Sequence, residues 1–105
     1  MDLSRRSYLT LLILKLVQEH KATYGYQIAQ LVKEQSQGQY QLKEGTLYPL
    51  LNHLEKNGIL KGDWRVNLEG GPPRKYFQLT SEGQKLLEKE KQTLLWFTQL
   101  VFGTG

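Results

Sequence analysis

Four stretches of the 105-residue chain carry apolar side chains at helical spacing. Residues 4–20 are apolar on nearly every side, which is typical of a helix that is buried on several faces. A second helix is predicted after Thr23, a favourable N-cap residue, with Ile28 and Val32 on one stripe. It ends at residues 35–38, whose Gln, Ser and Gly composition is typical of a turn.

The third stretch is EGTLYPLLNHLEKNGIL at residues 44–60. Its apolar stripe comprises Leu47, Leu50, Leu51 and Leu54. This spacing predicts an amphipathic helix, and Gly58 is placed to end it.

The first turns of this helix contain Gly45, Tyr48 and Pro49, which are unusual there. A start near Thr46 would place Pro49 where few backbone N–H groups are needed. A start at Lys43 would place Pro49 in the second turn, at a cost of up to ~3 kcal/mol. The sequence leaves both starts open.

The period then changes from helical to strand-like. Residues 63–67 and 74–79 predict two short strands, and a loop rich in Gly and Pro separates them at residues 68–73. In the second strand one face carries Lys75, Phe77 and Leu79, and the other carries Arg74, Tyr76 and Gln78. The sequence therefore predicts a β-hairpin.

The fourth helix is predicted to begin at residues 80–81 and to run to about Phe102. Ser81 and Gln84 have the spacing of a capping box. The first half of this helix is charged, whereas residues 94–102, LLWFTQLVF, are apolar over more than one face.

The predicted order is helix, helix, helix, hairpin, helix. It is the order of a winged helix-turn-helix, a mainly α fold with a β-hairpin wing. We expect residues 1–79 to form a winged-helix DNA-binding domain. Residues 80–105 are expected to form a dimerisation helix that is continuous with it.

Charge and composition restrict the choice of function. The chain has 14 Lys and Arg against 10 Asp and Glu, a net charge of +4 that fits a nucleic-acid partner without requiring one. Its lack of cysteine excludes a disulfide framework and a thiolate zinc site. No segment reaches the ~18–20 apolar residues of a membrane span. We therefore expect a cytoplasmic protein with no cofactor, no metal and no membrane partner.

The start of the third helix is the first candidate DNA contact, because the recognition helix of a helix-turn-helix meets base edges with its N-terminal residues. The candidates are Lys43, Gly45, Thr46, Tyr48, Pro49 and Asn52. Gly45 would let the backbone approach the duplex, and the free N–H groups of a helix start suit phosphate. Two alternatives stay open: Tyr48 as a half-buried aromatic under the hairpin, and Lys43 as an ordinary surface lysine.

The hairpin is the second candidate DNA contact. Arg65, Arg74 and Lys75 flank its loop and would bind phosphates. The alternative is that these charges only keep an exposed edge strand soluble.

The apolar end of the last helix predicts a twofold homodimer, because one winged-helix core has little room for it. The candidate interface residues are Leu9, Leu12, Leu16, Leu94, Phe97, Leu100 and Val101. Packing of the last helix on the first within one chain is the alternative, and we expect both. Trp96 either stacks on a flat aromatic ligand or fills the interface.

Three stretches together resemble the PadR family of bacterial transcription regulators: YGYQI at residues 24–28, the stretch at 44–60, and GGPPRKYFQLTSEGQKLL at 70–87. The resemblance implies a winged-helix dimer, usually a repressor, that binds palindromic operator DNA and releases it when a small molecule binds. Residues that match the family are Thr46, Leu47, Tyr48 and Pro49 at the recognition helix, Arg74 and Lys75 in the wing, and Gly83 in the last helix. The core positions of the family match Leu47, Leu51, Leu54 and Ile59 of this chain.

Longer family members carry a helical domain after the wing, whereas one helix follows it here. The chain therefore resembles the small subgroup, in which that helix alone supplies dimerisation. Some small members bind planar hydrophobic drugs between aromatic side chains at the dimer centre, where Trp96 would lie. Phenolic acids are a second ligand class of the family, and the sequence does not select between the two classes. A chain without an effector site is a third alternative that stays open.

Catalysis is not expected, because His20 and His53 are far apart and no nucleophile, phosphate-loop or metal motif is present. The alternative function is a winged-helix protein-interaction module without sequence-specific DNA binding. Salt separates the two, because DNA binding weakens steeply with salt and apolar protein pairing does not.

Overall fold

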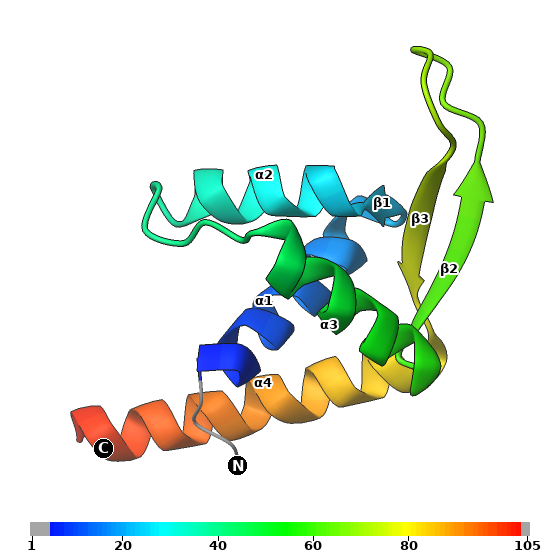
Figure 1. Ribbon diagram of the computed structural model, residues 1–105. Helices are drawn as coiled ribbons and strands as arrows, with labels where there is room; N and C mark the ends of the chain where they lie inside the picture. The colour runs from blue at the N-terminus through cyan, green and yellow to red at the C-terminus, as the bar shows by residue number, and fades with distance from the viewer. Residues whose placement is uncertain (1–4, 104–105) are drawn as a thin grey trace.

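The computed structural model describes residues 5–103 of the chain (Figure 1). In chain order its elements are α1 (Arg5–His20), β1 (Thr23–Tyr24), α2 (Gly25–Gln35), α3 (Glu44–Lys56), β2 (Leu60–Arg65), β3 (Arg74–Leu79) and α4 (Ser81–Phe102). The predicted order of three helices, a hairpin and a last helix is confirmed, and β1 is an addition to it. Residues 1–4 and 104–105, which the predicted ranges include, lie outside the described part.

The hairpin belongs to a three-stranded antiparallel sheet with the order β1-β3-β2. Thr23 of β1 lies opposite Phe77 of β3, and the β2–β3 register runs from Leu60↔Leu79 to Arg65↔Arg74. The strand β2 begins three residues before the predicted start, because the buried Leu60 pairs with Leu79. Figure 1 shows the long loop of the hairpin projecting away from the helices.

The end of α3 follows the prediction. Gly58 has a φ of +75°, in the left-handed region that favours glycine. The Ile59 N–H donates to the Leu54 carbonyl at 2.9 Å, and the Gly58 N–H donates to the Glu55 carbonyl at 3.0 Å. These two bonds form a Schellman motif, which turns the chain directly from α3 into β2.

Two predicted N-caps are wrong. Thr23 lies in β1 and is fully buried, with its hydroxyl bonded to Gln27, and Tyr24 is the N-cap of α2. In α4 the cap is Thr80 and not Ser81, because the Thr80 side chain accepts the Gly83 N–H at 3.0 Å. The Thr80 hydroxyl also donates to the Gly58 carbonyl at 2.6 Å, which ties α4 to the turn after α3.

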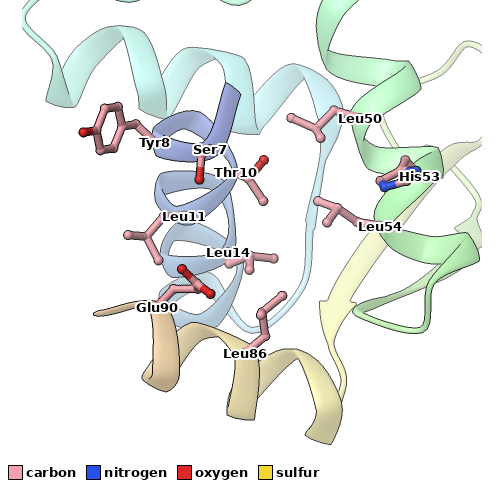
Figure 2. Close-up of a pocket in the computed structure, with 10 residues that line it drawn as sticks. All are labelled: Ser7, Tyr8, Thr10, Leu11, Leu14, Leu50, His53, Leu54, Leu86 and Glu90. Carbon is pink, nitrogen blue, oxygen red and sulfur yellow. The ribbon is translucent and has the colours of Figure 1, made fainter. Parts of the chain in front are cut away.

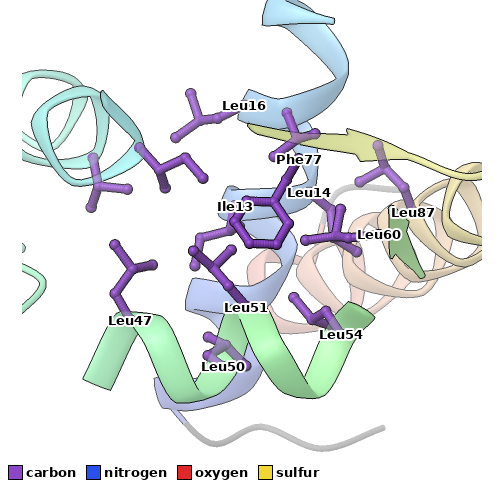
Figure 3. Packing of buried hydrophobic residues seen from close by; sticks show 13 residues of the cluster. Ile13, Leu14, Leu16, Leu47, Leu50, Leu51, Leu54, Leu60, Phe77 and Leu87 are labelled. Atoms are coloured by element: carbon purple, nitrogen blue, oxygen red, sulfur yellow. The ribbon is translucent and has the colours of Figure 1, made fainter. Parts of the chain in front are cut away.

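The core lies where α1 is enclosed by α2, α3, the sheet and the first half of α4 (Figure 3). Its fully buried side chains include Ile13, Leu16, Leu51, Phe77 and Leu87, one or more from each of four elements. The leucine stripe of α3 is buried as predicted, with Leu47, Leu50, Leu51 and Leu54 all inside.

The first turn of α4 packs very closely on the turn between α3 and β2. A Cβ added to Gly83 would lie 2.7 Å from Leu79 Cδ1 and closer still to the Ile59 carbonyl oxygen. Glycine is therefore the residue that fits this buried position, and its small size sets the direction in which α4 leaves the domain.

Candidate nucleic-acid interface

The helix α3, which the sequence predicts to be the recognition helix, begins at Glu44, with Lys43 as an N-cap that makes no side-chain cap bond. The structure therefore has the earlier of the two predicted starts, and Pro49 lies within the second turn. Proline has no N–H, so the Gly45 carbonyl lacks the donor that residue 49 would otherwise supply. The helix continues unbroken through this position. Nothing lies within 4 Å of a Cβ built on Gly45, so the first turn of α3 has an open face.

Tyr48 meets the N-terminus of α2. A Cβ added to the buried Gly25 would lie 2.7 Å from Tyr48 Cε1 and 2.9 Å from Cζ. The ring thus packs against the backbone of Gly25, while the Tyr48 side chain remains 41% exposed. The ring is therefore half-buried, and contact of its exposed part with DNA stays a prediction.

A groove of about 420 Å³ lies between α3 and the hairpin, and we call it the wing groove. The residues that line it are Tyr24, Gly25, Tyr26, Tyr48, Asn52, Trp64, Pro73, Arg74, Lys75 and Phe77. They come from β1 and the start of α2, from the middle of α3, and from both strands of the hairpin. The fold thereby brings together four of the predicted DNA contacts, Tyr48, Asn52, Arg74 and Lys75.

The remaining predicted contacts lie outside the wing groove. Lys43 and Thr46 line a separate hollow of about 420 Å³ beside the loop of residues 38–42. Arg65 pairs with Asp63 at 3.3 Å, and its guanidinium lies 4.7 Å from the centre of the Tyr76 ring. These cations are exposed, so they extend the basic surface beyond the groove.

Arg74 is held at the edge of the wing groove. Its guanidinium lies 4.5 Å from the centre of the Tyr24 ring and pairs with Glu69 at 3.5 Å. Desolvation lowers the pKa of Arg74, but hydrogen bonding to Tyr76 and the charge of Glu69 outweigh it and raise that pKa. Arg74 is therefore a permanent cation at the edge of the groove.

Lys75 differs from the other two wing cations because its ion pair is the shortest of the three and ties β3 to α3. Its Nζ lies 2.6 Å from Glu55 Oε1, at the end of α3. Both side chains are partly buried, with 25% of Lys75 and 31% of Glu55 exposed.

Three aromatic residues of the groove were missed from the sequence. Tyr26 and Trp64 are 63% and 67% exposed, and the Tyr24 ring lies 5.1 Å from the Tyr76 ring. The YGY sequence at residues 24–26 was a usable signal, because exposed aromatics beside Arg and Lys are typical of nucleic-acid surfaces. Trp64 is next to Arg65 in a predicted strand, and this pairing of an aromatic with a basic residue was a second signal of a nucleic-acid surface.

The apolar end of α4, residues 94–102, extends past the rest of the chain (Figure 1). Its most exposed side chains, 52–75% accessible, are Leu95, Trp96, Leu100, Val101 and Phe102. Leu94 and Phe97 are half-buried. The prediction that Leu16 lies at an interface is wrong, since Leu16 is fully buried in the core of its own chain, and Leu9 is only 8% exposed. Leu12 is partly buried against the core.

Another hollow, of about 410 Å³, lies between α1, α3 and α4, and we call it the helical pocket (Figure 2). Its floor is apolar and comprises Leu11, Leu14, Leu50, Leu54 and Leu86. Ser7, Tyr8, Thr10, His53 and Glu90 supply its polar groups. The pocket thus contacts the recognition helix from the side opposite the wing groove.

Comparison with known proteins decides the class of the protein. Residues 13–89 match the model of the transcriptional regulator PadR-like family. The chain belongs to the PadR-like family. The resemblance expected from the three sequence stretches is confirmed, and so is the winged-helix fold.

Solved structures agree with this PadR-like assignment. A PadR family transcription regulator from Clostridium difficile R20291 is 34% identical, with 91% of this chain and 96% of that chain covered and a TM-score of 0.78. A transcriptional regulator from Clostridium thermocellum is 32% identical, with 93% and 92% covered and a TM-score of 0.77. A relative found by sequence, the transcriptional regulator Rv3488 of Mycobacterium tuberculosis, agrees as well. It is 33% identical over 75 residues, which are 71% of this chain and 68% of that protein.

Membership in the PadR-like family makes this chain a DNA-binding transcriptional regulator and not an enzyme. Among residues 5–103, no three His, Cys, Asp or Glu side chains are grouped so that they could hold a metal ion. None of the helices within this range is long and apolar enough to cross a membrane.

Proposed function

We propose that this PadR-like protein is a ligand-responsive repressor that binds a palindromic operator as a homodimer. The observation that carries the proposal is the wing groove, in which Tyr48 and Asn52 of the recognition helix face Arg74 of the wing. A recognition helix and a basic wing on one concave surface can contact base edges and phosphates of one duplex together.

The two elements have different tasks in this proposal. The first turns of α3, from Lys43 to Asn52, enter the major groove, where Gly45 allows close approach and Tyr48 and Asn52 reach base edges. Arg65 and Arg74 of the wing neutralise phosphates, which positions the protein without selecting a sequence. The exposed rings of Tyr26 and Trp64 supply apolar contact with sugars and bases beside these charges.

The dimer rests on two apolar surfaces that lack a cover in the described chain. One is the apolar end of α4, and the other is the helical pocket (Figure 2). In a twofold dimer, the apolar end of one chain packs against α1 and the helical pocket of its partner. Leu94, Phe97, Leu100 and Val101 form the contact on α4, and Leu12 contributes from α1. The two recognition helices would then meet half-sites about one helical turn apart, ~34 Å.

The effector proposal rests on Trp96, which is 60% exposed on the apolar end of α4. A twofold dimer through this segment brings two copies of Trp96 near the axis. Two indole rings would hold a planar hydrophobic or phenolic molecule by stacking. A ligand that changes the spacing of the two α4 helices also changes the spacing of the recognition helices, and this would release the operator.

The first experiment is selection of binding sites from random duplex DNA, followed by titration of the selected site from 50 to 300 mM salt. The expected result is an inverted repeat that binds one dimer. Arg74→Ala should reduce affinity for all DNA and lower the salt slope by about 1.8, which corresponds to one lost phosphate contact in each subunit of the dimer. Lys89→Ala, which removes an exposed lysine on α4, is the matched control and should leave the slope unchanged.

Weak binding with no selected sequence would contradict the proposal. It would favour the alternative function, a winged helix that binds protein partners without reading DNA sequence. Equal slopes for Arg74→Ala and Lys89→Ala would show that Arg74 does not contact phosphate.

A further inference from the structure

One carboxylate joins the recognition helix to both strands of the wing. Glu55 lies in the last turn of α3, where its Oε1 accepts a hydrogen bond from Lys75 Nζ at 2.6 Å. Its Oε2 accepts the Gly62 backbone N–H at 3.1 Å. Gly62 belongs to β2 and Lys75 belongs to β3, so a single side chain holds the base of the hairpin. We call Glu55, Gly62 and Lys75 the Glu55 clamp.

The side chains of the Glu55 clamp lie close to Gly62 and to two aromatic rings. A Cβ added to Gly62 would lie 2.5 Å from Glu55 Oε2 and closer still to Lys75 Cε. The Lys75 Nζ also lies 5.7 Å from the centre of the Trp64 ring and 5.6 Å from that of Phe77. A charge-assisted bond in such a partly covered site is stronger than an ion pair in open water.

We propose that Glu55 is a positioning residue for DNA binding. It fixes the orientation of the wing relative to the recognition helix, and it holds Lys75 away from DNA phosphates. This inference rests on the proposed function, because the operator is contacted by both elements at once. A surface that is already in its bound arrangement binds more tightly, since less freedom is lost on association.

The clamp changes the expected role of Lys75. Lys75 pairs with a partly buried carboxylate at 2.6 Å, whereas Arg65 and Arg74 pair with exposed carboxylates at 3.3 and 3.5 Å and can exchange them for phosphates. Lys75 therefore neutralises no phosphate and adds nothing to the salt dependence of DNA binding. Loss of Glu55 would free the ammonium group of Lys75, which already lines the wing groove, to make one non-specific phosphate contact per subunit. Loss of Glu55 should therefore weaken binding to the operator and strengthen binding to non-specific DNA.

The test measures operator and non-specific affinity across salt for Glu55→Gln, Lys75→Met and the double variant. Glu55→Gln should lower operator affinity about tenfold, the effect of losing one hydrogen bond to a charged group. It should raise the non-specific salt slope by about 1.8, because one Lys75 is released in each subunit of the dimer. Lys75→Met should lower operator affinity similarly with an unchanged slope, and the double variant should have the wild-type slope.

Gly62→Ala tests the geometry of the clamp without a change of charge. The added methyl group would displace the ends of the Glu55 and Lys75 side chains, while both stay ionised. It should lower operator affinity as Glu55→Gln does. Loss of stability alone would reduce the active fraction of protein but would not change a salt slope. The slope is therefore the measurement that distinguishes a positioning role from a merely structural one.

NMR of the free protein tests the clamp without DNA. In the wild type, the Gly62 amide proton should resonate downfield, as expected for a bond to a carboxylate, and it should move upfield in Glu55→Gln. Residual dipolar couplings of residues 60–65 against those of α3 report the orientation of the wing. They should change in Glu55→Gln and in Gly62→Ala.

The results that would overturn each proposal are different. A drop in slope for Lys75→Met as large as that for Arg74→Ala would make Lys75 a phosphate contact and overturn the clamp. Unchanged dipolar couplings in Glu55→Gln would overturn it as well, whatever the DNA results. Absence of sequence-specific binding by the wild type would overturn the proposed function instead.

Discussion

Gly83→Ala and Gly45→Ala are a matched pair that tests how the structure uses glycine. Each glycine lies in the first turn of a helix, Gly83 in α4 and Gly45 in α3. A Cβ at Gly83 would overlap the Ile59 carbonyl, which is backbone and cannot rotate away, whereas a Cβ at Gly45 meets nothing within 4 Å. The same substitution is therefore expected to have opposite effects on stability.

The magnitudes follow from these environments. Overpacking costs about 1–3 kcal/mol, and a displaced α4 also weakens the Thr80 cap bonds. Replacement of Gly by Ala at a compatible site gains about 0.4–1 kcal/mol, because the unfolded chain loses freedom. We expect Gly83→Ala to reduce the free energy of unfolding by about 2 kcal/mol. For a domain of this size the Tm would fall by roughly 8–16 °C. Gly45→Ala should raise the Tm by a few degrees.

Circular dichroism at 222 nm during heating and urea titration measures both variants. Protein concentration must be equal in all samples, because the Tm of a dimer depends on it. A wild-type Tm for Gly83→Ala would refute the packing argument at α4. A large loss of stability for Gly45→Ala would show that this glycine serves the fold. If Gly45→Ala has normal stability but binds the operator more weakly, Gly45 is needed for the close approach of α3 to DNA.

Three further predictions follow from single side chains. Tyr48→Ala should lower operator affinity at least tenfold more than non-specific affinity in fluorescence anisotropy, and equal losses would deny Tyr48 a role in specificity. Thr80→Ala should cost about 1–2 kcal/mol in urea denaturation, whereas Thr80→Ser should retain most of the cap, and equal midpoints for the two would refute the capping role. Leu100→Asp should convert dimer to monomer in sedimentation at micromolar concentration, with Gln92→Asp on the same helix as control, and an unchanged dimer would exclude the apolar end of α4 as the interface.

The order of elements was predictable from the sequence because it depends on local patterns. The leucines of α3 repeat at a spacing that only a helix can bury on one side, and Gly58 ends this helix in the conformation that favours glycine. The two strands of the hairpin alternate around a loop of Gly and Pro. Each of these signals lies within a few residues of the structure that it predicts.

Contacts between distant residues were not predictable in this way. The strand β1 has two residues, too few to show alternation, and it exists because Thr23 pairs with Phe77. Glu55 lay on the polar side of α3 in the sequence, and nothing near it in the chain indicates Lys75 as its partner. The pattern at Gly25 likewise gives no sign of Tyr48, which the fold brings against it. The sequence therefore located the candidate surface, and the structure distinguished Lys75, which pairs with a partly buried carboxylate, from Arg65 and Arg74, which pair with exposed ones.

The pairing of β1 with β3 also bears on the synthesis of the protein. No part of the sheet can form until β3 has been translated, because β3 lies between the other two strands. At ~5–20 residues/s, the ribosome needs roughly 3–11 s to proceed from Thr23 to Phe77. During this time Ile13, Val17 and Ile28 lack the side chain of Phe77 that later covers them. The nascent chain thus exposes core side chains of α1 and α2 for several seconds, a period in which chaperones have access to them.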